Sequence, residues 1–490
     1  MPDTNFKNNN INYSSFFSFL IIINSLFSFN IQFIVFINLF LVITYLYSIN
    51  SRSILPFILF FLFIYPESFI GESIFDRTSI FIYSLILFLV RLKNKNTPTF
   101  TKTQYFFLIF ILLLSIFIYL PIPIETYLNF NYFNGIETNY ISNNRSSHML
   151  GFAIPVLFAV FLISIIHSDF NNTITFLKIY EYILIISFLI VTLSFIRYFL
   201  LFEFIPQGYT DSIRNDGFRI SGVNIPDTIG YGKKLLLPFA IVLSYNFSKT
   251  KNKYNNFILI LLIVTLFFTY SRIIILTMVV IFIVTFYFNY SFKKLKKVLL
   301  FLTLIITFFI FSGGISILVN RSFNSDGTGY NFSGRELIYS SSIPIIFDSP
   351  FVGLRPGGYL SLLIKGYSTE FNGIVYNLNV VSAHSFYIVI ALEWGIPFLI
   401  LMIIVLFYSI FILIKSINLI DKNSICNFNN NTTHYRNWAI SILSLLISFC
   451  FLGVTDFIPY QVFFSLIGLS WGFNYIINNQ NINGKRVLFS

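Results

Sequence analysis

Long runs of apolar residues, separated by short polar segments, dominate the pattern along this chain. Runs at 257–270, 273–288 and 298–319 each approach or reach the ~20 apolar residues that cross a bilayer as a helix. Inside hydrocarbon the backbone N–H and C=O groups must bond within the structure, which favours helices for these runs. We therefore expect an all-α, polytopic membrane protein in which residues 1–490 form a single integral membrane domain.

The same pattern predicts about fourteen transmembrane helices, with a range of about 12 to 14. Basic residues gather in short loops, and the positive-inside rule then places those loops and both termini in the cytoplasm. The basic loops placed in the cytoplasm include one near Arg91 and one near Arg436. The predicted spans are 14–29, 31–48, 54–70, 78–92, 104–121, 149–167, 178–203, 232–247, 256–270, 272–290, 298–319, 384–415, 437–455 and 459–477.

Composition agrees with a membrane location, since 56% of the residues are hydrophobic and only 10% are charged. In a soluble protein the formal net charge of +12 would suggest nucleic acid, but here the basic loops orient the chain in the membrane. We expect no nucleic-acid partner. Cys426 lies in a predicted loop and Cys450 inside a predicted span, so they are not expected to pair, and no Cys/His set has metal-ligand spacing. We expect neither a metal nor a cofactor.

This topology leaves three long loops on the non-cytoplasmic side, at 122–148, 204–231 and 320–383. The third is large enough for structure of its own, and its apolar stretches ELIYSSSIPIIF and GGYLSLLI are not typical of a disordered linker. We expect short helices that lie over the membrane face and cover the active site. Glycines and prolines in the loop, Gly353 among them, would turn the chain between these helices.

Several polar residues that could take part in binding or catalysis fall on the non-cytoplasmic side of this topology. Arginines on that side oppose the positive-inside bias, so each is expected to have a partner or a function. The alternatives are an ion pair for Arg335, a loop hydrogen bond for His384 and a helix partner for Glu393. The candidates are Arg219 in RISG, Arg272 in YSR, Arg335, Glu336 and Arg355 in the 320–383 loop, His384, and Glu393.

Taken together, these residue types favour a transfer reaction on a diphosphate. Guanidinium groups bind phosphate oxygens bidentately and remain charged at physiological pH. A histidine near its unperturbed pKa of ~6.5 accepts a proton from an attacking hydroxyl. The sequence shows no Asp-x-Asp pair of the kind that holds a divalent ion on a nucleotide sugar, which agrees with a transfer reaction that needs no metal.

The pattern resembles the O-antigen polymerase and ligase superfamily of bacterial polysaccharide assembly. The order and spacing of several short motifs carry the resemblance. Ser385 stands where many relatives have Asn, and Gly353-Leu354-Arg355-Pro356-Gly357 replaces a Gly-x-Gly turn, which weakens a family role for Arg355. The motifs are RISG (219–222), YSR (270–272), Gly334-Arg335, FDSPFVG (347–353), Ala383-His384 and Glu393-Trp394-Gly395.

The resemblance implies a GT-C-like glycosyltransferase in the bacterial inner membrane that uses an undecaprenyl diphosphate-linked oligosaccharide at the periplasmic face. In that interpretation Arg219, Arg272 and Arg335 hold the diphosphate and His384 activates the acceptor hydroxyl. Glu336, Glu393 and Arg355 are supporting candidates, membrane lipids surround the protein, and a chain-length regulator is a further partner. We favour a polymerase that extends a lipid-linked repeat unit. The alternatives are a ligase that transfers the glycan to lipid A core and, in another class, a lipid-linked oligosaccharide flippase or other transporter.

Overall fold

The computed structural model describes the C-terminal part of the 490-residue chain most fully. Of the predicted spans, 14–29, 31–48, 54–70, 78–92 and 298–319 lie outside the described residues, and 104–121 and 149–167 are described only in fragments. The described residues are 106, 107, 109–111, 113, 156, 173–200, 220, 228–248, 251–269, 271–289, 335–354, 368–371, 374–377, 385–424, 430–455, 458 and 460–487.

Helices make up nearly all of the described structure, because the apolar runs have the length and composition that helices need. Among the described helices, Ile179–Ile196, Ile396–Asp421 and Thr433–Val454 are long and apolar enough to cross a membrane. The elements are α8 (Thr173–Leu200), α9 (Thr228–Asn246), α10 (Asn255–Phe268), α11 (Arg272–Phe288), α14 (Arg335–Asp348), β1 (Ser368–Phe371), β2 (Ile374–Asn377), α16 (Phe386–Trp394), α17 (Ile396–Ser424), α18 (Asn430–Thr455) and α19 (Tyr460–Val487).

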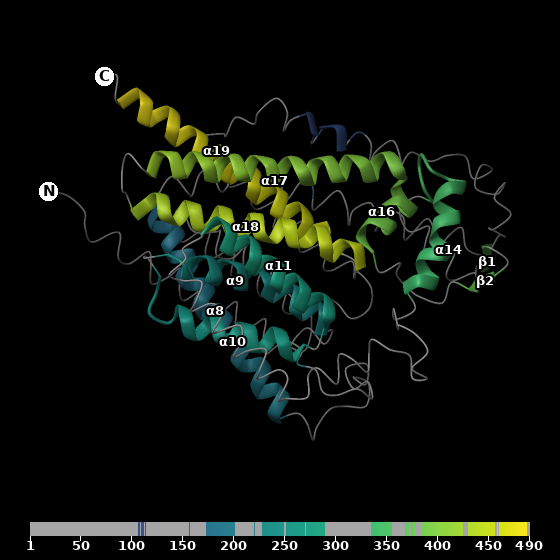
Figure 1. Ribbon diagram of the computed structural model, residues 1–490, viewed down its shortest axis with the longest axis horizontal. Coiled ribbons are helices and arrows are strands. Elements are labelled where there is room, and N and C mark those ends of the chain that lie inside the picture. Colours follow the sequence, from purple (N-terminus) through teal and green to yellow (C-terminus); the bar gives the residue numbers. More distant parts are fainter. Residues whose placement is uncertain are drawn as a thin grey trace, which may run out of the picture.

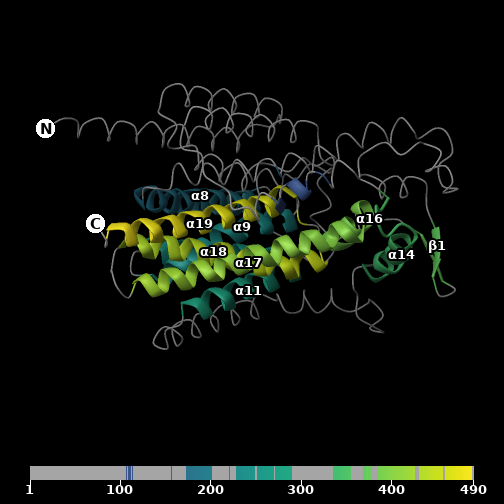
Figure 2. The same cartoon turned by 90° about the horizontal axis from the view of Figure 1, so that it is seen from above.

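The long helices pack side by side as a bundle with two distinguishable ends (Figures 1 and 2). At one end, which we call the Arg436 end, Arg436 near the start of α18 bonds Asp421 near the end of α17 and Asn289 after α11. At the other, the α14 end, Tyr339 of α14 bonds the backbone of Val454 near the end of α18. Because Asn289, just after the end of α11, bonds Arg436, the start of α11 and the turn between α10 and α11 lie at the α14 end.

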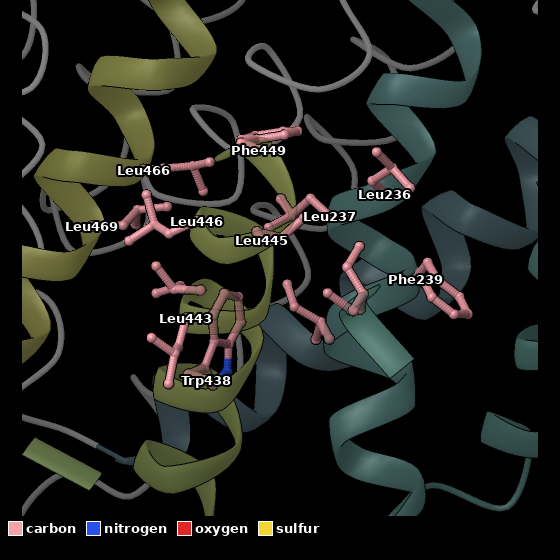
Figure 3. Packing of buried hydrophobic residues seen from close by; sticks show 14 of the residues in the cluster. Leu236, Leu237, Phe239, Trp438, Leu443, Leu445, Leu446, Phe449, Leu466 and Leu469 are labelled. Atoms are coloured by element: carbon pink, nitrogen blue, oxygen red, sulfur yellow. The ribbon is translucent and has the colours of Figure 1, made fainter. Parts of the chain in front are cut away.

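The core extends along α18, which packs against both α9 and α19. Leucines and aromatic side chains of these three helices belong to it (Figure 3). Trp438, Trp471 and Phe239 are among the largest side chains that are fully buried. Because lipid tails are as apolar as these residues, close packing rather than exclusion from water holds such helices together in a membrane.

One prediction about local structure was wrong and another was incomplete. The span predicted as one helix at 384–415 is two helices, α16 and α17, separated by Gly395, whose φ of 86° is incompatible with a continuous helix. The 320–383 loop contains α14, as expected for a short helix, but also the antiparallel hairpin β1–β2, in which Thr369 pairs with Tyr376. The predicted spans 178–203, 232–247, 256–270, 272–290, 437–455 and 459–477 overlap with α8, α9, α10, α11, α18 and α19, and α18 and α19 extend beyond the predicted limits.

Candidate functional site

The α14 end brings the RISG and YSR motifs together. Ile220, the residue that follows Arg219, is fully buried and donates its backbone N–H to the carbonyl oxygen of Phe268 at 3.0 Å. Phe268 ends α10, and Arg272 begins α11 after a short turn. Arg219 itself lies outside the described residues. The chain beside Arg219 is therefore fastened to the turn that precedes Arg272.

Arg272 occupies the first position of α11 and is exposed. The turn before it is held locally, since Thr269 Oγ1 donates to the carbonyl of Leu266 and accepts from the backbone N–H of Ser271. Backbone N–H groups at a helix start carry partial positive charge, and the helix dipole disfavours a cation there. A guanidinium at this position adds to the positive potential, which suits a bound phosphate group.

The FDSPFVG motif docks on the Glu-Trp-Gly motif through the backbone, in an arrangement we call the clip (residues 349–354 against 392–396). Leu354 donates its N–H to the carbonyl oxygen of Leu392 at 2.6 Å. Ile396 donates its N–H to the carbonyl oxygen of Pro350 at 2.7 Å. The second bond uses an N–H at the start of α17 that has no partner within its own helix. The clip joins two motifs that are about forty residues apart in sequence.

Both glycines of the clip are required by conformation and by space. Gly353 has a φ of 62° and Gly395 a φ of 86°, a region that side chains disfavour. A Cβ on Gly353 would stand 2.5 Å from the carbonyl oxygen of Leu392. A Cβ on Gly395 would collide with the backbone of Phe351. The two chain segments thus approach so closely that glycine is needed on each side.

Glu393 lies in the last turn of α16, next to the clip, and is buried. The sequence placed this carboxylate inside a long membrane span, but the structure places it where a short helix ends and the chain turns. Its neighbour Trp394 is buried and stacks on Phe398 with ring centroids 5.0 Å apart.

His384, the candidate general base, lies outside the described residues, but the next residue is fixed in detail. Ser385 is the N-cap of α16, where its Oγ accepts a hydrogen bond from the N–H of Ile388. The same Oγ donates to the carbonyl oxygen of Gly453 in α18 at 3.1 Å. Since Ser and Asn are both preferred N-caps, the Ser-for-Asn departure preserves this function.

Arg335 and Glu336 begin α14, and their side chains lie outside the described residues, as does Arg355. The described part of α14 shows how the helix is placed. Tyr339 donates its hydroxyl to the carbonyl oxygen of Val454 at 2.9 Å. The first turn of α14 is therefore tied to the end of α18, beside the N-cap of α16. The structure thus brings α14, which Arg335 begins, and Ser385, the N-cap of α16, to the same end of the bundle.

Sequence reasoning missed the residues that build this end rather than those that would act in it. Nothing in the sequence singled out Tyr339 or Tyr387. The hydroxyl of Tyr339 donates to the carbonyl oxygen of Val454, and that of Tyr387 donates to the carbonyl oxygen of Cys450. The clip had a signal, because Gly395 precedes Pro397 by two residues, a pattern typical of a helix boundary. In the part of the chain that the structure describes, no group of three His, Cys, Asp or Glu side chains could hold a metal ion.

A comparison with protein-family models finds a match to the O-antigen ligase family over residues 257–403. Members of this family are lipid-linked sugar transferases, both ligases and polymerases. The matched segment includes Arg272, Arg335, His384 and Glu393, whereas Arg219 precedes it. It also includes the whole clip. A search of curated proteins finds no match.

Proposed function

We propose that this chain is a polysaccharide polymerase of the bacterial inner membrane, because residues 257–403 match the O-antigen ligase family and the structure contains helices that are apolar and long enough to cross a membrane. It would transfer a glycan from an undecaprenyl diphosphate carrier to a hydroxyl of another lipid-linked repeat unit at the periplasmic face. The observation that carries the proposal is that the elements bearing the family motifs meet at one end of the bundle.

In the proposed reaction His384 takes the proton from the acceptor hydroxyl, and the acceptor oxygen forms a bond to C1 of the donor sugar. The bond between C1 and the diphosphate oxygen breaks, and the diphosphate leaves with the electron pair. Arg272, Arg219 and Arg335 would bind the diphosphate and stabilise the negative charge that develops on it. The exposed position of Arg272 at the start of α11 supports this role. No metal ion is needed for this charge balance.

The family name favours one second candidate, a ligase that transfers the glycan to lipid A core. The two reactions share the donor and the leaving group, and they differ only in the acceptor. A flippase is the alternative from another class, in which the carrier lipid crosses the bilayer without a glycosidic bond being made or broken.

One experiment separates the three. The purified protein in nanodiscs receives its lipid-linked repeat unit in the presence of a metal chelator, and the products are resolved on a gel. A ladder of lengthening glycans, lost in His384→Ala, is the expected result. Transfer that appears only when lipid A core is supplied would show a ligase. Unchanged substrate under both conditions would contradict the transferase and favour the flippase.

The control for this experiment is Lys251→Ala, which removes an exposed cation at the Arg436 end. In the hydrogen bonds described for it, Lys251 donates to the side-chain oxygens of Asn246 and Asn256. The ladder should be unchanged in this variant. A similar loss in Lys251→Ala and in His384→Ala would show that the assay responds to general damage rather than to the chemistry.

A further inference from the structure

The helix α14 lies across the end of the bundle rather than along it. In Figure 1 it runs crosswise to α17 and α18, and Figure 2 shows it beyond the end at which α17 begins. If the long helices cross a membrane, a helix in this orientation lies parallel to the membrane plane. Interfacial helices have this orientation.

The two faces of α14 differ sharply in exposure. Ser342 is fully buried and Ile345 is 4% exposed, so this face packs on the protein. On another face Ile343 is 41% exposed and Phe347 is 70% exposed, and Phe351, four residues further on, is 76% exposed. Large apolar side chains at this spacing on an exposed helix face are unfavourable in water.

The depth of α14 follows from its two fastenings. Tyr339 bonds the carbonyl of Val454, which is the last residue of the apolar span Thr433–Val454. Pro350 accepts a bond from Ile396, which is the first residue of the apolar span Ile396–Asp421. Both fastenings are at the boundary where a membrane span ends or begins. If these limits mark the bilayer surface, the helix and the turn after it lie at the level where hydrocarbon gives way to headgroups.

We propose that Ile343, Phe347 and Phe351 insert into the boundary between headgroups and acyl chains of the bilayer leaflet at the α14 end. Aromatic residues are enriched at this depth in membrane proteins. Bilayer lipid fits this face better than another protein, because the face begins where two spans reach the bilayer surface. The clip would hold the turn that carries Phe351 at that depth.

Brominated lipids provide a test, because bromine quenches tryptophan fluorescence only at short range. The chain has three natural tryptophans, Trp394, Trp438 and Trp471, and each is at most 1% exposed. The wild-type protein measures their background fluorescence. Phe347→Trp and, separately, Phe351→Trp are reconstituted in nanodiscs made of lipids brominated either near the headgroup or deep in the acyl chain. Two variants calibrate the depth. Ile404→Trp introduces the probe at an exposed position within the α17 span, and Lys251→Trp introduces it in an exposed loop.

The expected result is stronger quenching of the new tryptophan by the shallow bromines than by the deep ones, with the order reversed for Ile404→Trp. Quenching by aqueous iodide, with no effect of either lipid, would overturn the proposal in favour of a face turned to water. Protection from both quenchers that appears only with two chains per nanodisc would overturn it in favour of a second copy. Because this readout needs no substrate, its failure is distinct from failure of the transferase.

Discussion

At the Arg436 end several of the described links between helices join one side chain to another, whereas at the α14 end the links named below finish on backbone carbonyl oxygens. Arg436 bonds Asp421 and Asn289 through its guanidinium, and it also donates to the carbonyl of Phe288. Tyr180 donates to Asn255 Oδ1 at 2.5 Å. At this end ionic and polar side chains serve to hold α8, α10, α11, α17 and α18 together.

At the α14 end Leu354, Ile396 and Ile220 donate backbone N–H groups to backbone carbonyls of other elements. The hydroxyls of Tyr339 and Ser385 also donate to backbone carbonyls. Because these links use backbone groups, the side chains at neighbouring positions remain available to bind a ligand. Under the proposed function, arginine and histidine each have a structural task at the Arg436 end and a chemical task at the α14 end, and the following predictions test that difference.

The two histidines should give the largest contrast. In the proposed mechanism His384→Ala removes the general base, and the transfer rate should fall by about 10²–10⁴-fold while the melting temperature is unchanged. His434 is buried at the Arg436 end, with its Nδ1 3.0 Å from the hydroxyl of Tyr245. His434→Ala should cost about 1–3 kcal/mol of stability and leave the rate per folded molecule unchanged. Single-turnover rates and thermal unfolding in detergent measure both. An unimpaired rate in His384→Ala would refute the assignment.

The two arginines should differ in the same sense. Arg272→Ala should lower kcat/KM for the lipid-linked donor by about 10- to 100-fold, since a hydrogen bond to a charged group contributes roughly 1.5–3 kcal/mol. Arg272→Lys should recover part of this loss, because the charge remains and the bidentate fork does not. Arg436→Ala should instead lower the unfolding temperature with little change in kcat/KM. If Arg272→Ala lowered stability as much as Arg436→Ala, Arg272 would be a structural residue too.

Replacing Gly353 tests whether the clip matters through close approach or through φ alone. Gly353→Ala should reduce transfer by about tenfold, because a strained φ costs of order 1–3 kcal/mol and the added Cβ meets the carbonyl of Leu392. Asn tolerates a positive φ better than Ala, yet it carries the same Cβ, so Gly353→Asn should give no rescue. Full rescue by Asn would show that only φ matters.

A matched control for the clip is Gly453→Ala. Gly453 lies in helical α18 at the same end, and a Cβ there would stand 3.1 Å from the ring of Tyr387, a side chain that can shift. Its effect should be small. Comparable losses in Gly453→Ala and Gly353→Ala would mean that this end tolerates no added atoms anywhere, and the clip would have no special role.

The smallest effect is expected at the N-cap of α16. Ser385→Ala should destabilise the protein by about 1 kcal/mol, the usual cost of losing an N-cap oxygen. Ser385→Asn should restore most of that stability, because its amide oxygen can accept from the N–H of Ile388. Equilibrium unfolding and the transfer rate are measured together. Equal behaviour of the two variants would mean that the Oγ bond to Gly453, rather than the cap, is the important one.

Much of the described helical bundle could be predicted from the sequence, because apolar runs of membrane-span length leave the backbone few other structures. The exceptions are informative. The break at Gly395 was hidden inside a long, mainly apolar run, although Gly395 and Pro397 mark it. The hairpin β1–β2 was missed although Asn372-Gly373, a strong hairpin signal, separates its strands in the sequence.

The candidate site was predictable as a set of motifs but not as an arrangement. The sequence indicated that FDSPFVG and Glu393-Trp394-Gly395 belong together by resemblance, and nothing in either motif showed that their backbones bond. Such contacts depend on the positions of α14 and α16, which tertiary packing determines. Likewise the burial of Ile220 against Phe268 joins two motifs whose proximity no local pattern could reveal.

The most direct test of the central claim asks at which end the lipid-linked donor binds. A photo-crosslinking amino acid replaces Leu276, one turn after Arg272, or Tyr287 near the other end of the same helix; both positions are exposed, at 50% and 74%. The protein is irradiated with a radiolabelled undecaprenyl diphosphate-linked repeat unit. We predict labelling at position 276, competed by excess unlabelled donor, and none that is competed at position 287. Competed labelling at position 287 alone would contradict a donor site at the α14 end.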